Sequence, residues 1–333
     1  MNYKKWLLNG LIVCGFSSCF AAQEAQQIGW ENHEVPDDLE SGQFYNSKTL
    51  HMGTMVWNIA LSPDERLLGV NGPTNLSIVD METGRNIYDR RAVMSALAWM
   101  HNTPFIVVLL GGDIEIINPL SGEMVQKLKG LNLFAGRSIA VSGDDTTLAS
   151  GSDDNTVKIG DIRSGKCVQT LKGHGGRVNS VAISLNGRTV VSGWTDGIVK
   201  IWDIRSGKRT HILKGHGHWV ESIAISWDGK TVVSGSRDKT VKIWDIRSSK
   251  KYIQTLKGHA AQVNSVVISF DGRTVVSGSD DNTVKVWDSI SGECTQTLEG
   301  HQQGVRSVIV NSDNKTIVSG SFDKPVKVWE QKK

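Results

Sequence analysis

Residues 215–245 read GHGHWVESIAISWDGKTVVSGSRDKTVKIWD, which opens on a Gly-His pair and closes on a Trp-Asp pair. Three further stretches carry the same two pairs, with Glu in place of the last Asp in one of them. The Gly-His pairs and the Trp pairs both recur at steps of 42, 43 and 42 residues. Self-similarity at a period of about 40 residues indicates a repeat architecture, in which each unit buries its apolar faces only against its neighbours.

Each repeat is predicted to hold four short strands. Residues 222–226, Ser-Ile-Ala-Ile-Ser, alternate polar and apolar side chains as a half-buried strand does. Asp228-Gly229 follows as a hairpin turn, and two more apolar runs and a last strand complete the unit. Because the sequence shows no amphipathic run of helical length, this pattern favours a radial all-β array.

The marker pairs and their spacing resemble the WD-repeat family of β-propellers. Four units from residue 173 onward carry both pairs, and three weaker units precede them, one with Gly160 in place of the Trp. The resemblance implies an all-β fold, a seven-bladed β-propeller of four-stranded antiparallel blades. We expect the units at approximately residues 51–91, 92–130, 131–172, 173–214, 215–257, 258–299 and 300–333.

The two ends of the chain are predicted to meet in one blade. The last unit ends after its third strand, and residues 43–50 resemble the outermost strand of another unit at residues 167–171. We therefore expect residues 43–50 to supply the outer strand of the seventh blade and to close the ring, because closure removes two open sheet edges. The propeller would span residues 43–333, with residues 22–42 as an acidic linker before it.

The N-terminus is predicted to be an export signal. Two lysines, a short apolar run and a small-residue stretch are the three parts of a signal peptide, which we place at residues 1–21. Alternatively, residues 16–19 resemble a lipoprotein box, with a signal to residue 18 and a lipid on Cys19. The first interpretation predicts an exported, bacterial-type member of the family that is periplasmic or secreted, and the second predicts a lipid-anchored envelope protein.

His, Ser, Asp and Trp recur together at fixed offsets, and hydrolase triads use some of the same residue types. A catalytic site is needed once, whereas this set recurs in four units, so we predict no catalytic residue and no enzyme. A Trp–Ser–His–Asp chain satisfies the hydrogen-bonding groups of all four side chains when they are buried. In WD-repeat proteins such a tetrad is structural, and the resemblance implies that role for His174, Ser192, Asp196, Trp202, His216, Ser234, Asp238, Trp244, His259, Ser277, Asp281, Trp287, His301, Ser319, Asp323 and Trp329.

No metal or cofactor site is predicted. One His in each unit around a ring cannot converge on a single ion, and the pair His216 and His218 lacks further ligands at a matching spacing. The Ser-Gly-Ser runs belong to strand ends and hairpins rather than to a phosphate-binding loop of the P-loop type.

Partner binding is expected at positions that vary while the scaffold around them repeats. In propellers of this family, partners commonly dock on the face that holds the loop after Gly-His and the hairpin before the Trp strand. Two interpretations of Trp219 are equally good: it anchors an interface with a partner, or it packs over the neighbouring blade. Trp227 is predicted to be a turn residue that covers the sheet edge. The candidate partner-binding residues are Trp57, Arg177, Asn179, Trp219, Glu221, Arg237, Gln262, Asn264, Arg306 and Phe322.

The composition narrows the class of function. The formal net charge is +3 over 333 residues, without the dense basic patch of a nucleic-acid-binding protein. We expect a non-enzymatic WD-repeat scaffold that binds a protein or peptide on its top face and touches a membrane only through a lipid on Cys19. The alternatives are an envelope lipoprotein subunit of an assembly machine and a propeller with a small-ligand or enzymatic site at the central channel. We expect the first two units, which lack nearly all of the tetrad, to be the least stable.

Overall fold

The computed structural model describes residues 29–91, 94–110, 112–129, 131, 136–173, 175–247 and 254–333. The predicted signal segment, with Cys19, lies outside the described residues, and so does His174 of the first predicted tetrad. The described part of the chain offers no helical segment with the length and hydrophobicity that crossing a bilayer requires.

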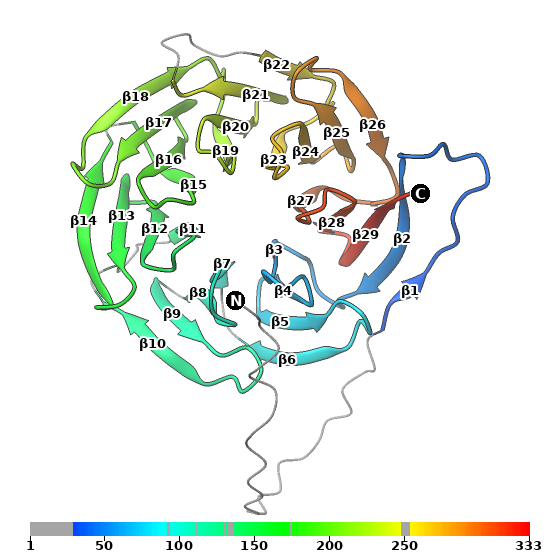
Figure 1. Ribbon diagram of the computed structural model, residues 1–333, viewed down its shortest axis with the longest axis horizontal. Helices are drawn as coiled ribbons and strands as arrows, with labels where there is room; N and C mark the ends of the chain where they lie inside the picture. Colours follow the sequence, from blue (N-terminus) through cyan, green and yellow to red (C-terminus); the bar gives the residue numbers. More distant parts are fainter. Residues whose placement is uncertain are drawn as a thin grey trace, which may run out of the picture.

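Seven antiparallel sheets stand side by side around a ring in the described residues, which confirms the predicted seven-bladed propeller (Figure 1). In blades 1 to 6 the strands run from the inner rim outward in chain order. Their strands are, for blade 1, β3 (Asn58–Leu61), β4 (Leu67–Asn71), β5 (Asn75–Asp80) and β6 (Asn86–Arg91); for blade 2, β7 (Met94–Trp99), β8 (Ile106–Leu110), β9 (Asp113–Ile117) and β10 (Met124–Leu128); for blade 3, β11 (Gly136–Val141), β12 (Thr147–Ser152), β13 (Thr156–Asp161) and β14 (Lys166–Lys172); for blade 4, β15 (Val178–Ile183), β16 (Thr189–Trp194), β17 (Ile198–Asp203) and β18 (Arg209–Lys214); for blade 5, β19 (Val220–Ile225), β20 (Thr231–Ser236), β21 (Thr240–Asp245) and β22 (Gln254–Lys257); and for blade 6, β23 (Val263–Ile268), β24 (Thr274–Ser279), β25 (Val284–Asp288) and β26 (Cys294–Leu298).

Blade 7 is built from both ends of the chain. Its inner three strands are β27 (Val305–Val310), β28 (Thr316–Ser321) and β29 (Pro325–Gln331), and β2 (Phe44–His51) pairs antiparallel with β29. The predicted closure of the ring by an N-terminal strand is therefore confirmed. Within the segment predicted as a linker, β1 (Glu31–Asn32) adds a short fifth strand outside β2, and such a short edge offers little to a second chain.

A recurring glycine lets neighbouring blades approach each other. A Cβ atom on Gly235 of β20 would lie 2.7 Å from a methyl carbon of Val263 on the next inner strand, and one on Gly193 would lie 2.6 Å from Val220. A Cβ at either position would force a neighbouring valine to move, so the packing of the blades favours glycine there. The apolar clusters accordingly span two blades, as where Val233 and Val241 of blade 5 pack with Val275 of blade 6.

A repeated hydrogen bond also joins the inner strands. The backbone N–H of Val266 in blade 6 donates to Ser222 Oγ of blade 5 at 3.0 Å. The same bond crosses the seam between blade 7 and blade 1, where the N–H of Ile59 donates to Ser307 Oγ at 3.2 Å. The inner serines therefore help to hold the first and last blades of the ring together.

Candidate functional site

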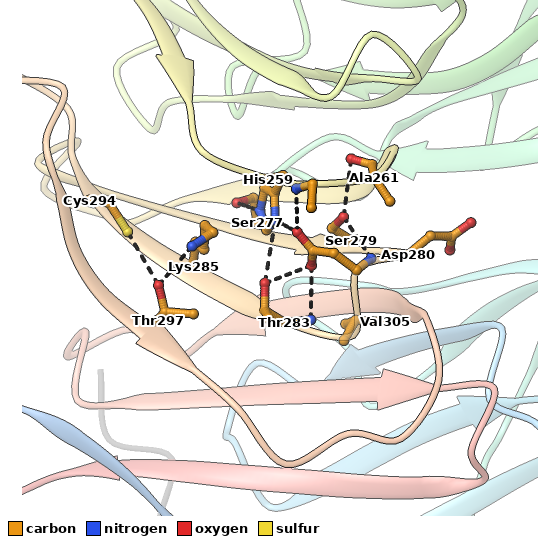
Figure 2. A network of polar contacts seen from close by, with 12 residues as sticks. His259, Ala261, Ser277, Ser279, Asp280, Thr283, Lys285, Cys294, Thr297 and Val305 are labelled. Carbon is orange, nitrogen blue, oxygen red and sulfur yellow. Dashed lines mark hydrogen bonds and ion pairs between the residues drawn. The ribbon is translucent and has the colours of Figure 1, made fainter.

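The recurring His, Ser, Asp and Trp residues form hydrogen-bond networks inside blades 5, 6 and 7. In blade 6, His259 Nε2 lies 2.8 Å from Ser277 Oγ (Figure 2). His259 Nδ1 lies 2.8 Å from Asp281 Oδ2, and Trp287 Nε1–H donates to Ser277 Oγ at 2.8 Å. Blades 5 and 7 repeat this arrangement around the side chains His216, Ser234, Asp238, Trp244, His301, Ser319, Asp323 and Trp329.

The carboxylates of these networks are held in their ionised form. Burial alone would raise the pKa of Asp281, but hydrogen bonds from His259, Thr283 and the Ala260 backbone N–H outweigh it and hold that pKa well below its usual range. The same causes lower the pKa of Asp238. An ionised carboxylate has no proton to give, so it does not act as a general acid. Across the described ranges, no three His, Cys, Asp or Glu side chains gather in a way that could hold a metal ion.

Blade 4 uses a different network. Trp194 is fully buried at the end of β16, and its Nε1–H donates to Ser192 Oγ at 2.8 Å, as Trp202 Nε1–H does at 2.9 Å. The ammonium of Lys200 lies 3.6 Å from the centroid of the Trp194 ring and 3.6 Å from Asp196 Oδ2. In the described part of blade 4, two indoles thus donate to one serine hydroxyl, whereas in blades 5 to 7 the serine hydroxyl contacts one indole and one histidine.

A cavity of about 450 Å³ opens at one mouth of the ring, which we call the top cavity. Six blades each contribute one residue to it from the same register position, directly before a Ser or Asn of the inner strand. These residues are Trp57, Arg137, Asn179, Glu221, Asn264 and Arg306. Phe322 completes the apolar part of the wall. Six of the ten predicted partner-binding residues therefore line one cavity: Trp57, Asn179, Glu221, Asn264, Arg306 and Phe322.

The other four predicted residues lie around the top cavity without lining it. The Arg237 guanidinium carbon is 3.9 Å from the centroid of the Trp219 ring, and Arg237 forms an ion pair with Glu221. Arg177 of the neighbouring blade lies 5.9 Å from the same ring, so half-buried Trp219 packs across the boundary between two blades. Gln262 Nε2–H donates to Asp280 Oδ2 at 2.8 Å and thereby supports the cavity wall.

Two polar groups in the top cavity have few hydrogen-bond or ion-pair partners among the described residues of the protein. The Arg306 guanidinium carbon lies 4.7 Å from the centroid of the Phe322 ring, and its nearest carboxylate oxygen, on Asp280, is 3.7 Å away. Burial lowers the pKa of Arg306, although the charge of Asp280 opposes that shift. Asn179 donates to the carbonyl of Val220 at 3.1 Å, whereas its buried Oδ1 has no hydrogen-bond partner among the described residues.

Sequence reasoning missed Arg137, Asn58 and the inner serines of this cavity. Arg137 Nε–H donates to Asp153 at 2.5 Å and lies at the register position that Asn179 holds one blade later. It was missed because its unit lacks the Gly-His pair that marks the first strand. The sequence does contain a feature that indicates Arg137. It directly precedes Ser138, just as Asn179 directly precedes Ser180 in the next unit.

Comparisons with known proteins agree with this architecture. The family model described as "Nucleolar protein 10-like, N-terminal domain", a β-propeller, matches residues 133–328, which is more than half of the chain. A "WD repeat-containing protein SL1-17" from Schistosoma mansoni is 30% identical over 137 residues. That match covers 39% of this chain and 44% of the relative, so the chain spans less than half the length of this curated relative.

These comparisons correct the expected location. The expectation of an exported protein, whether periplasmic, secreted or lipid-anchored, is wrong, because the matching family is described by a nucleolar protein and the relative comes from a eukaryote. A basic and apolar start is a short compositional pattern, and it carries less information than a match over more than half of the chain. The repeats, the seven-bladed ring and the family match show that the chain belongs to the WD-repeat β-propellers, in the family described as nucleolar protein 10-like, N-terminal domain.

Proposed function

We propose that this propeller is a non-enzymatic scaffold that binds a protein or peptide segment in the top cavity. WD-repeat propellers are generally interaction scaffolds without catalytic activity, and this supports the proposal. The observation that carries it is that six blades present Trp, Arg, Asn and Glu side chains at one register position, while the scaffold residues around them repeat. A fold that needed only to close its ring would gain nothing from this variety.

The chemistry of the cavity fits an extended peptide. The unpartnered Asn179 Oδ1 is an acceptor for a backbone N–H, and the guanidinium of Arg306 is a donor for a carbonyl or a carboxylate. Trp57, which is 40% exposed, and Phe322 offer an apolar wall for a side chain. A volume of about 450 Å³ lies in the range of sites that enclose a small molecule or a few side chains.

A comparative capture experiment tests the proposal. The tagged full chain, the double variant Trp57→Ala/Arg306→Ala, which removes two side chains from the wall of the top cavity, and the control variant Lys208→Ala, at an exposed site in the turn between β17 and β18, are incubated with the same cell extract. Because the matching family is described by a nucleolar protein, we propose that nuclear and non-nuclear fractions be assayed separately. We expect the wild type and the control to capture a common set of proteins that the double variant loses.

Hydrogen exchange on the captured complex then locates the contact. We expect added protection at the starts of the inner strands, around Asn179 and Glu221. If the double variant melts like the wild type and still captures the same proteins, the top cavity is not the docking site.

A further inference from the structure

Residues 29–43, which we call the clasp, run along the outside of blade 7 before the chain enters β2 (Figure 1). Within the clasp, β1 pairs with the outer edge of β2, and the N–H of His33 extends this pairing by donating to the Ser47 carbonyl at 2.8 Å. In the described residues the other six sheets end at their fourth strand. The clasp is therefore an addition to one blade, and that blade is the one that closes the ring.

One end of the clasp lies against blade 1. A Cβ atom on Gly84, in the turn between β5 and β6, would lie 2.5 Å from the backbone N and 2.6 Å from the ring carbon Cδ1 of Trp30. Gly84 has a φ of 72°, in the left-handed region that favours glycine. Half-buried Trp30 packs against an apolar cluster that contains Leu50 of β2 and Val79 of β5. The indole therefore joins blade 7 to blade 1.

The other end of the clasp holds the end of β29 and the residue that follows it. The N–H of Gly42 donates to the Lys332 carbonyl at 2.9 Å, and the N–H of Lys332 donates to the Gln43 carbonyl at 2.8 Å. The Lys332 ammonium donates to the Leu39 carbonyl at 2.6 Å. Gln331 Nε2–H donates to the Gly42 carbonyl at 2.6 Å. These hydrogen bonds attach the clasp to the same strand that β2 pairs with.

Blade 6 also holds the point at which the clasp continues into β2. Gln296 Oε1 of β26 accepts from the N–H of Phe44 at 2.7 Å, and Gln296 Nε2–H donates to the Phe44 carbonyl at 2.6 Å. Phe44 is buried in a cluster with Leu298 of blade 6 and Trp329 of blade 7. The clasp and the start of β2 thus contact three neighbouring blades, namely blades 6, 7 and 1.

The contact between the clasp and the first blade is easily reversed. β1 pairs with β2 through two residues. The Nε1–H of Trp30 is buried without a hydrogen-bond partner among the described residues, and an unsatisfied buried donor costs free energy. The ion pair between Glu31 and His51 has side chains that are 61% and 70% exposed, and such pairs contribute little. Segments with few buried contacts open before the rest of a fold does.

The strand that the clasp covers leads directly to the top cavity. Residues 52–57 connect β2 to blade 1 and carry Trp57 into the cavity wall. The N–H of Val56 donates to the Ser321 carbonyl at 3.0 Å, and the N–H of Trp57 donates to the Asn71 carbonyl at 2.8 Å. Because this connection is short, detachment of β2 would remove its support on one side.

We infer that the clasp is a conformational device that controls local opening of the ring. While residues 29–43 are docked, β2 stays paired with β29 and Trp57 keeps its place in the wall of the top cavity. When Trp30 leaves blade 1, β2 and residues 52–57 open together while the other blades stay folded. This opening belongs to the free chain, so it goes beyond the proposed scaffold function and requires no partner.

Hydrogen exchange followed by mass spectrometry on the full chain tests this inference. Trp30→Ala removes the contact with blade 1, and Lys332→Met removes the ammonium from the Leu39 carbonyl while it keeps most of the aliphatic stem. We expect Trp30→Ala to lower the protection of β2 and residues 52–57 about tenfold or more, and Lys332→Met to lower it less. Protection of β16 and β17 in blade 4 should stay within about twofold of the wild type.

Two matched controls accompany these variants. Trp227→Ala removes an indole that is 52% exposed in blade 5, and Lys208→Met removes an exposed ammonium in blade 4. Both should leave the protection of β2 and residues 52–57 unchanged, because neither side chain contacts the clasp.

Two outcomes would overturn the inference. Unchanged protection of β2 and residues 52–57 in Trp30→Ala would show that the clasp does not limit their opening. An equal loss of protection in all blades would show that Trp30 supports the whole fold rather than a local opening. Partner capture is not measured in this experiment, so a failure of the proposed scaffold function would leave its result unchanged.

Discussion

Blades 5 to 7 and blades 1 and 2 share one backbone pattern but fill its interior in opposite ways. In blade 6, Ser277 lies opposite Lys285 and anchors a network of buried polar side chains. In blade 2 the matching residue is Val108, opposite Glu115, and Ile117 takes the place of the indole. Both Val108 and Ile117 are fully buried. At these positions the interior of blade 2 is therefore apolar, whereas that of blade 6 holds hydrogen-bonded polar side chains.

The difference teaches that a blade requires a filled interior rather than one particular network. Replacing both partners of a hydrogen bond by apolar groups can be nearly neutral, whereas removing one partner leaves the other unsatisfied. Blade 3 shows a third solution. A Cβ on Gly160, at the indole position, would lie 2.8 Å from a methyl of Leu131, which fills the space from outside the sheet.

The expectation that blades 1 and 2 are the least stable remains a prediction. The largest effect is expected from Trp287→Ala in blade 6. It removes a buried indole and leaves Ser277 without a donor, and we expect a loss of about 3–5 kcal/mol in the free energy of unfolding by urea. Ile117→Ala in blade 2 removes less volume and no hydrogen bond, so equal losses would contradict the comparison.

A smaller loss is expected from His259→Ala. It deprives the carboxylate of Asp281 and the hydroxyl of Ser277 of one partner each, at an expected cost of about 2–3 kcal/mol. The matched control is His51→Ala, whose side chain is 70% exposed, with an expected change below about 0.5 kcal/mol. Similar urea midpoints for both variants would show that the network contributes little.

Ser277→Val gives blade 6 the residue type that blade 2 has at this position. Alone it leaves the Trp287 N–H and His259 Nε2 unsatisfied, and we expect a loss of about 2 kcal/mol. Adding Trp287→Phe removes the orphaned N–H, so the double variant should be more stable than the sum of the single changes predicts. Strict additivity in urea unfolding would contradict the view of the network as a unit.

The networks should also make stability depend on pH. The pKa of Asp281 is lower in the folded chain than its ordinary value of 3.8, so its contribution is fully present above that value and is lost as the pH falls toward the folded pKa. We expect the melting temperature of Asp281→Asn to vary less than that of the wild type between pH 5 and pH 2. Parallel curves for the two proteins would show that this carboxylate is not coupled to folding.

The smallest effect on stability is expected at the top of the ring. The side chains of the Arg237 and Glu221 ion pair are 35% and 16% exposed, and partly exposed pairs contribute about 0.2–1 kcal/mol. Arg237→Ala should therefore shift the urea midpoint little, whereas it should weaken partner capture if the top cavity binds as proposed. A large loss of stability with unchanged capture would place Arg237 in the scaffold instead.

Some of the site could be predicted because its residues have fixed places in each repeat. Asn179, Glu221 and Asn264 stand beside the Val that opens the first strand, and all three line the top cavity. The role of Trp194 could not be predicted, because its contact with Ser192 depends on which way an indole turns inside the blade. The contact between Trp227 and Phe270 could not be predicted for a related reason, since these residues are 43 positions apart and meet only when two blades stand side by side.

The amino-acid sequence by itself determined the repeat, the four-stranded unit and the joining of the two chain ends. These features depend on local alternation, turn residues and spacing, which can be read along one chain. Only the tertiary structure decided which side chains form the two mouths of the ring. Each mouth collects residues from blades about 40 positions apart, and their distances are set by how the blades pack rather than by their order in the chain.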